Sequence, residues 1–126
     1  MDLKVILKEI LAAHQQWINT DGREGTQINL MNAHLQEADL HDANLQDANL
    51  EGARLSVADL IRANLRRANL KNADFWMADM KDTVLQGTDL QGANLADVTN
   101  LTQTQISSAI TDEKPAHVRT RARRLP

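Results

Sequence analysis

Large apolar residues recur at every fifth position through the middle of the chain. The register starts at position 30 and holds for fourteen consecutive positions, which we expect to form the core: Leu30, Leu35, Leu40, Leu45, Leu50, Leu55, Leu60, Leu65, Leu70, Phe75, Met80, Leu85, Leu90 and Leu95. Ala stands two positions before eleven of them, the exceptions being Ile28, Thr83 and Thr88, and the position between is Asn or Asp in most copies. The repeated unit is therefore Ala, Asn or Asp, Leu, and two variable residues.

A period of five fits neither of the two regular elements. On an α-helix each step of five turns the chain by roughly 140°, so these residues would point in all directions. On a flat strand the same step places successive residues on alternate faces. Within one unit, however, the Ala and the Leu are two apart and point the same way. The pattern therefore predicts very short strands joined by turns, so that the chain coils around its own Leu side chains.

The repeat over residues 28–99 resembles that of the pentapeptide-repeat proteins. The resemblance implies an all-β solenoid, a right-handed β-helix of quadrilateral cross-section in which four units make one coil. The fourteen units then give about 3.5 coils, stacked at the usual spacing of about 4.8 Å between paired strands. Departures from the pattern indicate that the stack is ending, and they fall at Thr83, Val84, Thr88, Val98 and Thr99.

Residues 2–18 carry apolar side chains at helical spacing, with charged and amide side chains between them. This pattern predicts an amphipathic helix that starts after an N-cap, Asp2, and ends at the turn-forming run 19–22. We expect its apolar face to cover the first coil, with His14 and Trp17 at the edge of the core. The alternative is a helix that is offered to a partner or to a membrane.

Two further segments follow the repeat. At Asn100 the five-residue register breaks, and the next residues predict a short helix capped by Thr102. The last segment contains five Lys or Arg and no acidic residue, which is typical of a solvated tail, although a basic arm also suits nucleic acid or an acidic protein surface. The expected organisation is an N-terminal helix with its connection, the β-helix, a C-terminal cap and a basic tail: residues 1–27, 28–99, 100–113 and 114–126.

The composition narrows the functional classes. The 126 residues carry a net charge of −3 and include no Cys, and no apolar run reaches the roughly 18 residues that cross a bilayer. His34 and His41 occupy different columns of the repeat, His14 and His117 lie outside it, and the sequence has no Gly-rich phosphate loop. We therefore expect a single cytoplasmic domain that is not an enzyme, with no cofactor, no metal, no small-molecule substrate and no membrane partner.

Residues twenty positions apart are expected to be vertical neighbours on the outside of the stack. Asp39, Asp59 and Asp79 then form an acidic column. Such a column suits a divalent cation or a basic partner, but Asp is also frequent at this position of the repeat. Since calcium sites need six or more converging oxygen ligands, we predict no metal site here.

A second outward group is apolar. Val57 and Met77 share one column, Trp76 lies beside Met77, and Ile61 begins the next face. A cluster that contains Trp and Met is typical of a protein contact, so these four residues are our candidate interface, for self-association or for an unidentified protein. The alternative is that the tail or a terminal helix covers them.

These features favour a non-catalytic protein-interaction or scaffold module of unknown biological role. The alternative is a DNA-mimicking binder of gyrase or of another DNA-binding protein, because some pentapeptide-repeat proteins imitate duplex DNA. Residues 28–99 carry eleven acidic and six basic residues, a net charge of −5, and the basic residues dilute the acidic surface that mimicry needs. We expect no direct binding of nucleic acid by the repeat stack.

Overall fold

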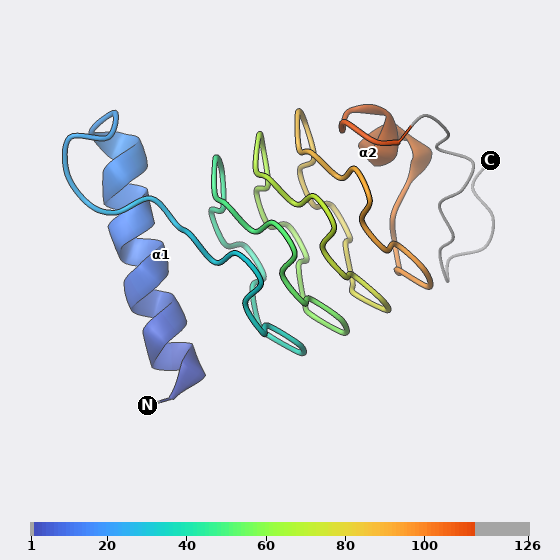
Figure 1. Ribbon diagram of the computed structural model, residues 1–126, viewed down its shortest axis with the longest axis horizontal. Coiled ribbons are helices and arrows are strands. Elements are labelled where there is room, and N and C mark those ends of the chain that lie inside the picture. Colours follow the sequence, from blue (N-terminus) through green and yellow to red (C-terminus); the bar gives the residue numbers. More distant parts are fainter. Residues whose placement is uncertain (1, 113–126) are drawn as a thin grey trace.

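The chain forms an N-terminal helix, a stack of coils, and a short helix at the far end of the stack (Figure 1). Helix α1 spans Leu3–Asn19, and helix α2 spans Gln103–Ser107. The computed structural model describes residues 2–112, and the basic segment 114–126 lies outside the described residues. Neither helix within residues 2–112 is long and apolar enough to cross a membrane.

Parallel bridges between residues twenty positions apart build the stack. They run from the pair Asn29 and Asn49 to the pair Asp79 and Thr99, and each bridge is a single residue long. Four units of five residues separate the partners, so each coil has four faces. We number the faces by the inward residues they contain: 30, 50, 70 and 90 on face 1; 35, 55, 75 and 95 on face 2; 40, 60 and 80 on face 3; 45, 65 and 85 on face 4.

The same backbone bonds recur from unit to unit. On face 1 the Leu50 N–H donates to the Asn69 carbonyl at 2.8 Å, and the Asn69 N–H donates to the Ala48 carbonyl at 2.9 Å. At the following corner the Gly52 N–H donates to the Lys71 carbonyl at 2.8 Å. These bonds satisfy the backbone polar groups that such short strands leave open, and they hold each coil in register with the next.

The fourteen residues of the five-residue register point into the stack. Thirteen of them are buried, and Leu30 in the first coil is partly buried. Two of the small-residue positions hold Thr: Thr83 and Thr88 are buried, and their hydroxyls donate to the Leu60 and Leu65 carbonyls at 2.7 and 2.6 Å. Because their polar atoms are satisfied, these Thr residues continue the stack, although we expected them to mark its end.

Both helices start at the N-caps expected from the sequence. Asp2 accepts the Lys4 N–H at 3.0 Å. Thr102 accepts the Gln105 N–H at 3.2 Å, and the Gln105 side chain accepts the Thr102 N–H at 2.8 Å, which completes a capping box. The Gln105 side chain also donates to the Met80 carbonyl at 2.9 Å and so ties α2 to the coil beneath it.

Helix α1 lies beside the first coil, at the left of Figure 1. His14 is completely buried there, whereas we expected it at the edge of the core. Its Nδ1 accepts the Ile28 N–H at 3.0 Å, and its Nε2 donates to the Gln46 carbonyl at 2.7 Å. Both backbone groups belong to the first coil, which has no preceding coil to pair with, so the imidazole takes the place of a missing neighbour.

Two further contacts order α1 and the connection that follows it. The partly buried Trp17 stacks on the His14 ring, with ring centroids 5.6 Å apart. Gly25 packs against the helix backbone, and a Cβ at this position would lie 2.3 Å from the Ala13 carbonyl oxygen. Only Gly fits so close an approach, which explains the residue at this point of the connection.

At the other end the pairing continues beyond residue 99, where we expected the β-helix to stop. Asn100, with a φ of 62°, adds one residue to a turn. The next bridge joins Asp89 to Ile110, one residue outside the twenty-residue step. Leu101 and Ile106 are buried and extend the core beneath α2. The inserted residue therefore shifts the register without ending the stack.

Candidate protein-binding surface

Three large apolar side chains gather on the outside of the stack, at the turn between face 2 and face 3. Trp76 is 44% exposed and Val57 is 46% exposed, and Met77 is partly exposed. Val57 lies one coil before Met77 in the same column, and its N–H donates to the Trp76 carbonyl at 2.8 Å. We refer to Val57, Trp76 and Met77 as the apolar corner.

Ile61 is separated from the apolar corner. It is partly exposed and lies in the next turn, at the opposite end of face 3. Asp59 stands between Val57 and Ile61 along this face. The structure therefore gathers three of the four residues of the candidate interface, and Ile61 joins them only when a partner extends across the whole of face 3.

The backbone of the apolar corner adopts the left-handed conformation. Val57 and Met77 both have a φ of 59°, and the Met77 N–H donates to the Ala96 carbonyl at 3.2 Å. Asn, Asp and Gly accept this conformation readily, whereas a β-branched residue such as Val is a genuine outlier there. The conformation costs an L-residue on the order of 1–2 kcal/mol, so the chain holds Val57 in this turn at a loss of stability.

Asp39, Asp59 and Asp79 lie in one column on face 3, where parallel bridges join them. The Oδ1 atom of each accepts the backbone N–H two residues later, at 3.3, 3.0 and 3.1 Å in chain order. Asp at this position therefore closes the turn that follows it. Turn formation therefore explains why Asp recurs in the acidic column, and the same residues give face 3 three carboxylates.

His41 lies beside the acidic column in the first coil. Its Nδ1 is hydrogen-bonded to Asp39, and it lies 4.0 Å from Oδ2 of Asp59. The hydrogen bond with Asp39 raises the pKa of His41 above its ordinary value and lowers the pKa of Asp39 below its own. Asp39, His41 and Asp59 each offer one ligand atom within 4.8 Å of the others. Three ligands fall short of the six or more oxygens that calcium takes.

Two arginines pair with acids one coil away. Arg62 donates to the two carboxylate oxygens of Asp42 at 2.7 and 3.0 Å, which lowers the pKa of Asp42. Arg67 makes the same bidentate contact with Asp47, at 3.0 and 3.2 Å. These four charges cancel in pairs and leave the remaining acids to set the sign of the surface.

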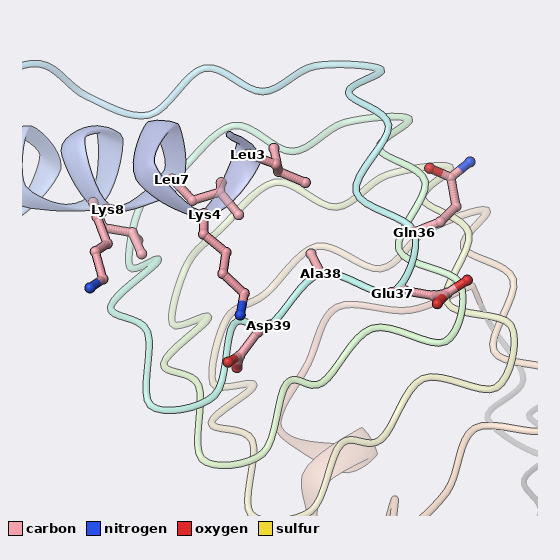
Figure 2. A pocket seen from close by; sticks show the side chains of 9 residues that line it. Leu3, Lys4, Leu7, Lys8, Gln36, Glu37, Ala38 and Asp39 are labelled. Carbon is pink, nitrogen blue, oxygen red and sulfur yellow. The ribbon is translucent and has the colours of Figure 1, made fainter. Parts of the chain in front are cut away.

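A hollow of about 420 Å³ lies between α1 and the first coil (Figure 2). Leu3, Leu7 and Leu11 line it from the helix, and the segment 36–39 lines it from the coil. Figure 2 shows the Lys4 side chain reaching toward Asp39 across this hollow. Sequence reasoning missed the hollow, because its shape depends on how α1 docks, which no residue pattern specifies.

The family model described as Pentapeptide repeats matches this chain in 8 copies, over residues 26–52, 48–87 and 63–110. The comparison with curated proteins found no match.

Solved structures of other proteins resemble the chain, among them two pentapeptide repeat proteins. One is a pentapeptide repeat protein from the thylakoid lumen of Arabidopsis thaliana, with a TM-score of 0.54, 26% sequence identity, and coverage of 55% of this chain and 48% of that protein. The other is a pentapeptide repeat protein from the cyanobacterium Cyanothece 51142, with a TM-score of 0.55, 33% identity, and coverage of 68% of this chain and 54% of that protein. The chain therefore spans about half the length of these solved relatives.

Proposed function

This chain belongs to the pentapeptide-repeat family and has its right-handed β-helix fold, and on this premise we propose that it is a protein-interaction module. Proteins of this family are generally non-enzymatic repeat proteins. The module presents the apolar corner to another protein or to a second copy of itself. No chemistry is performed, and the biological role lies in the partner that the surface selects.

The exposure of Trp76 is the observation that carries this proposal. A Trp side chain that is 44% exposed beside a Val that is 46% exposed leaves a large apolar area in water. Trp and Met are enriched in the core of protein interfaces, and Trp is one of the residue types that supply most of the binding free energy there. The turn that holds them is tied to the coils on both sides, so little conformational entropy is lost when a partner binds.

We also propose that α1 and α2 close the two ends of a stack of about 3.5 coils, because the open ends of a solenoid expose core and unpaired backbone. The hydrogen bonds that His14 accepts from the Ile28 N–H and donates to the Gln46 carbonyl support this role for α1. The burial of Ile106 and the bond from Gln105 to Met80 support it for α2.

The charge distribution does not favour the DNA-mimicry alternative. Duplex DNA carries one negative charge per ~1.7 Å, so a stack ~17 Å tall would need about ten. Residues 28–99 carry a net charge of only −5, and Arg62 and Arg67 each neutralise an acid of a neighbouring coil. Cytoplasmic localisation stays a prediction from the sequence.

The test replaces Trp76 with Asp and compares the variant with the matched variant Val84→Asp. Val84 is also an exposed apolar residue, 37% exposed, but it lies on face 4. Light scattering of the purified proteins measures self-association, and affinity capture from an extract of the source organism measures binding of another protein. We expect Trp76→Asp to abolish whichever association the wild type and Val84→Asp both make, with an unchanged circular dichroism spectrum.

Two results would contradict the proposal. One is an association that Trp76→Asp leaves intact, which removes the apolar corner from consideration. The other is equal loss in both variants, which points to a general effect of added charge on solubility.

A further inference from the structure

The net charge of the stack is confined to two adjacent faces. Faces 2 and 3 together carry eight acidic and three basic residues, whereas faces 1 and 4 carry three of each. The whole net charge of −5 of residues 28–99 therefore lies on one half of the molecule. The apolar corner is the edge that these two faces share.

Acidic residues flank the apolar corner along its own column and on both adjacent faces. The column that contains Val57 and Met77 begins with Glu37 and ends with Asp97, both exposed. Asp74 accepts the Trp76 N–H at 3.0 Å and lies on the face 2 side. On the face 3 side the chain continues directly into the acidic column of Asp39, Asp59 and Asp79.

The basic residues on the same two faces do not offset these acids. Arg62 is held by Asp42 in a bidentate pair at the far end of face 3. Arg54 is bridged to Asp74 on face 2, Lys81 follows Asp79 on face 3, and the remaining acids outnumber these two bases. On the opposite half, the charge of Arg67 is cancelled by Asp47, and the charge of Lys71 is cancelled by Asp89.

This charge pattern also decides between the two kinds of partner that the proposed function leaves open. A symmetric pair of identical chains joined at the apolar corner would place one acidic half against another. Like charges across an interface cost several kcal/mol and slow association. A partner of opposite charge gains from the same field, which steers it toward the corner.

We infer that the apolar corner binds a cationic polypeptide segment, in which one or two apolar side chains cover Trp76 and flanking Lys or Arg side chains meet the acids of faces 2 and 3. This inference rests on the proposed function and names the chemistry of its partner. The apolar contact supplies affinity, and the acids supply selection and a fast association rate.

The experiment uses the full chain and three fluorescein-labelled peptides of about 18 residues, long enough for five helical turns. The first is an amphipathic Leu/Lys peptide, the second replaces every Lys with Glu, and the third replaces every Leu with Gln. Fluorescence anisotropy measures each Kd. We expect the Leu/Lys peptide to bind most tightly, and its Kd to rise as salt screens the charges.

Matched variants locate the site. Trp76→Ser should weaken binding of the Leu/Lys peptide by about tenfold or more, as for an interface hot spot, while Val84→Ser leaves it unchanged. The double variant Glu37→Gln and Asp97→Asn should weaken binding at low salt and lose most of its effect at high salt. Glu51→Gln on face 1 is its control.

Each result has a distinct meaning. Equal binding of the Leu/Glu peptide overturns the inferred charge selection and leaves the proposed function standing. Binding that Trp76→Ser does not weaken places the peptide elsewhere and overturns the inference. A third result is that the wild-type chain self-associates, that Trp76→Ser abolishes this self-association, and that no peptide binds. This result identifies a second copy as the occupant of the apolar corner; it overturns the inferred cationic partner and leaves the proposed function standing.

Discussion

The second residue of each turn adopts the left-handed conformation, and the chain fills this position with different residue types. Asn32 and Asn72 have φ values of 58° and 60°, and Gly52 has a φ of 69°. These residues tolerate the conformation, because Gly has no Cβ and the Asn side chain bonds locally. Val57 occupies the same position with a φ of 59° and has neither advantage.

Val57→Asn is therefore expected to raise the free energy of unfolding by about 1 kcal/mol, since it relieves the strain of a β-branched residue in the left-handed region. Urea denaturation measures the change. Val84→Asn is the control, because Val84 is similarly exposed but is not among the residues with positive φ. A variant at position 57 that is no more stable than the wild type would show that the turn is not strained.

Phe75 and Trp76 are neighbours in sequence with opposite environments. Phe75 is fully buried, whereas Trp76 is 44% exposed. We expect Phe75→Ala to lower the free energy of unfolding by about 3–5 kcal/mol, because it removes an aromatic ring from the core. Trp76→Ala should lower it by less than half as much. Thermal unfolding of both variants checks the inward and outward assignment, and similar losses would refute it.

At the scale of the element, the first turn of face 3 is stabilised by the pair of His41 and Asp39. The pKa of His41 is raised, so its contribution to stability is complete below its ordinary value of 6.5 and is lost as the pH rises through the folded pKa. The pKa of Asp39 is lowered, so its contribution is complete above 3.8 and is lost as the pH falls. The pair supports the turn fully between pH 3.8 and pH 6.5.

A titration of the His41 ring protons by NMR tests this pair. The folded protein should give a pKa above 6.5 for His41, and Asp39→Asn should bring it back toward that value because the hydrogen bond to the carboxylate is its largest cause. An unchanged His41 pKa in the variant would assign the shift to Asp42 or Asp59 instead.

The repeat made the inward and outward positions predictable, because a period of five with Ala and Leu two apart has one solution that buries every Leu. The N-caps Asp2 and Thr102 were also predictable, since an N-cap needs only one side-chain oxygen that accepts a backbone N–H of the first helical turn. His14 was not, because its burial depends on which backbone groups of the first coil α1 meets.

The candidate site was predictable only in part. The twenty-residue stacking that the resemblance to the pentapeptide-repeat family implies placed Val57 and Met77 in one column and assembled the acidic column. The strain at Val57 was missed, although the frequent Asn, Asp and Gly at the same position of other units were a usable sign of left-handed turns. Ile61 was grouped too closely with Trp76. The order of the columns around the stack shows that Ile61 follows Val57, but it does not show how far apart the two turns at the ends of face 3 lie.

At the scale of the whole molecule, the bridges within residues 28–110 join each coil to the coil before it and the coil after it. Stability in such an array is approximately a sum over coils and the interfaces between them. Leu65 lies in the middle and is fully buried, whereas Leu30 lies in the first coil and is partly buried. The two residues are chemically identical but differ in how completely they are buried.

Leu65→Ala should therefore cost about 3–5 kcal/mol and Leu30→Ala less than about 2 kcal/mol. Chemical denaturation of the two variants gives the comparison, and amide hydrogen exchange reports whether the first coil opens separately. Equal losses at both positions would mean that the stack unfolds as a single unit with no weaker end.

The hydrogen bonds between coils, such as that from Leu50 to Asn69, lie along the axis of the stack. A tensile force along this axis therefore acts on one interface at a time and detaches the outermost coil first. Each detached coil lengthens the chain by about 70 Å when its residues are drawn out. Under mechanical load the protein should therefore extend in equal increments, one for each coil that detaches.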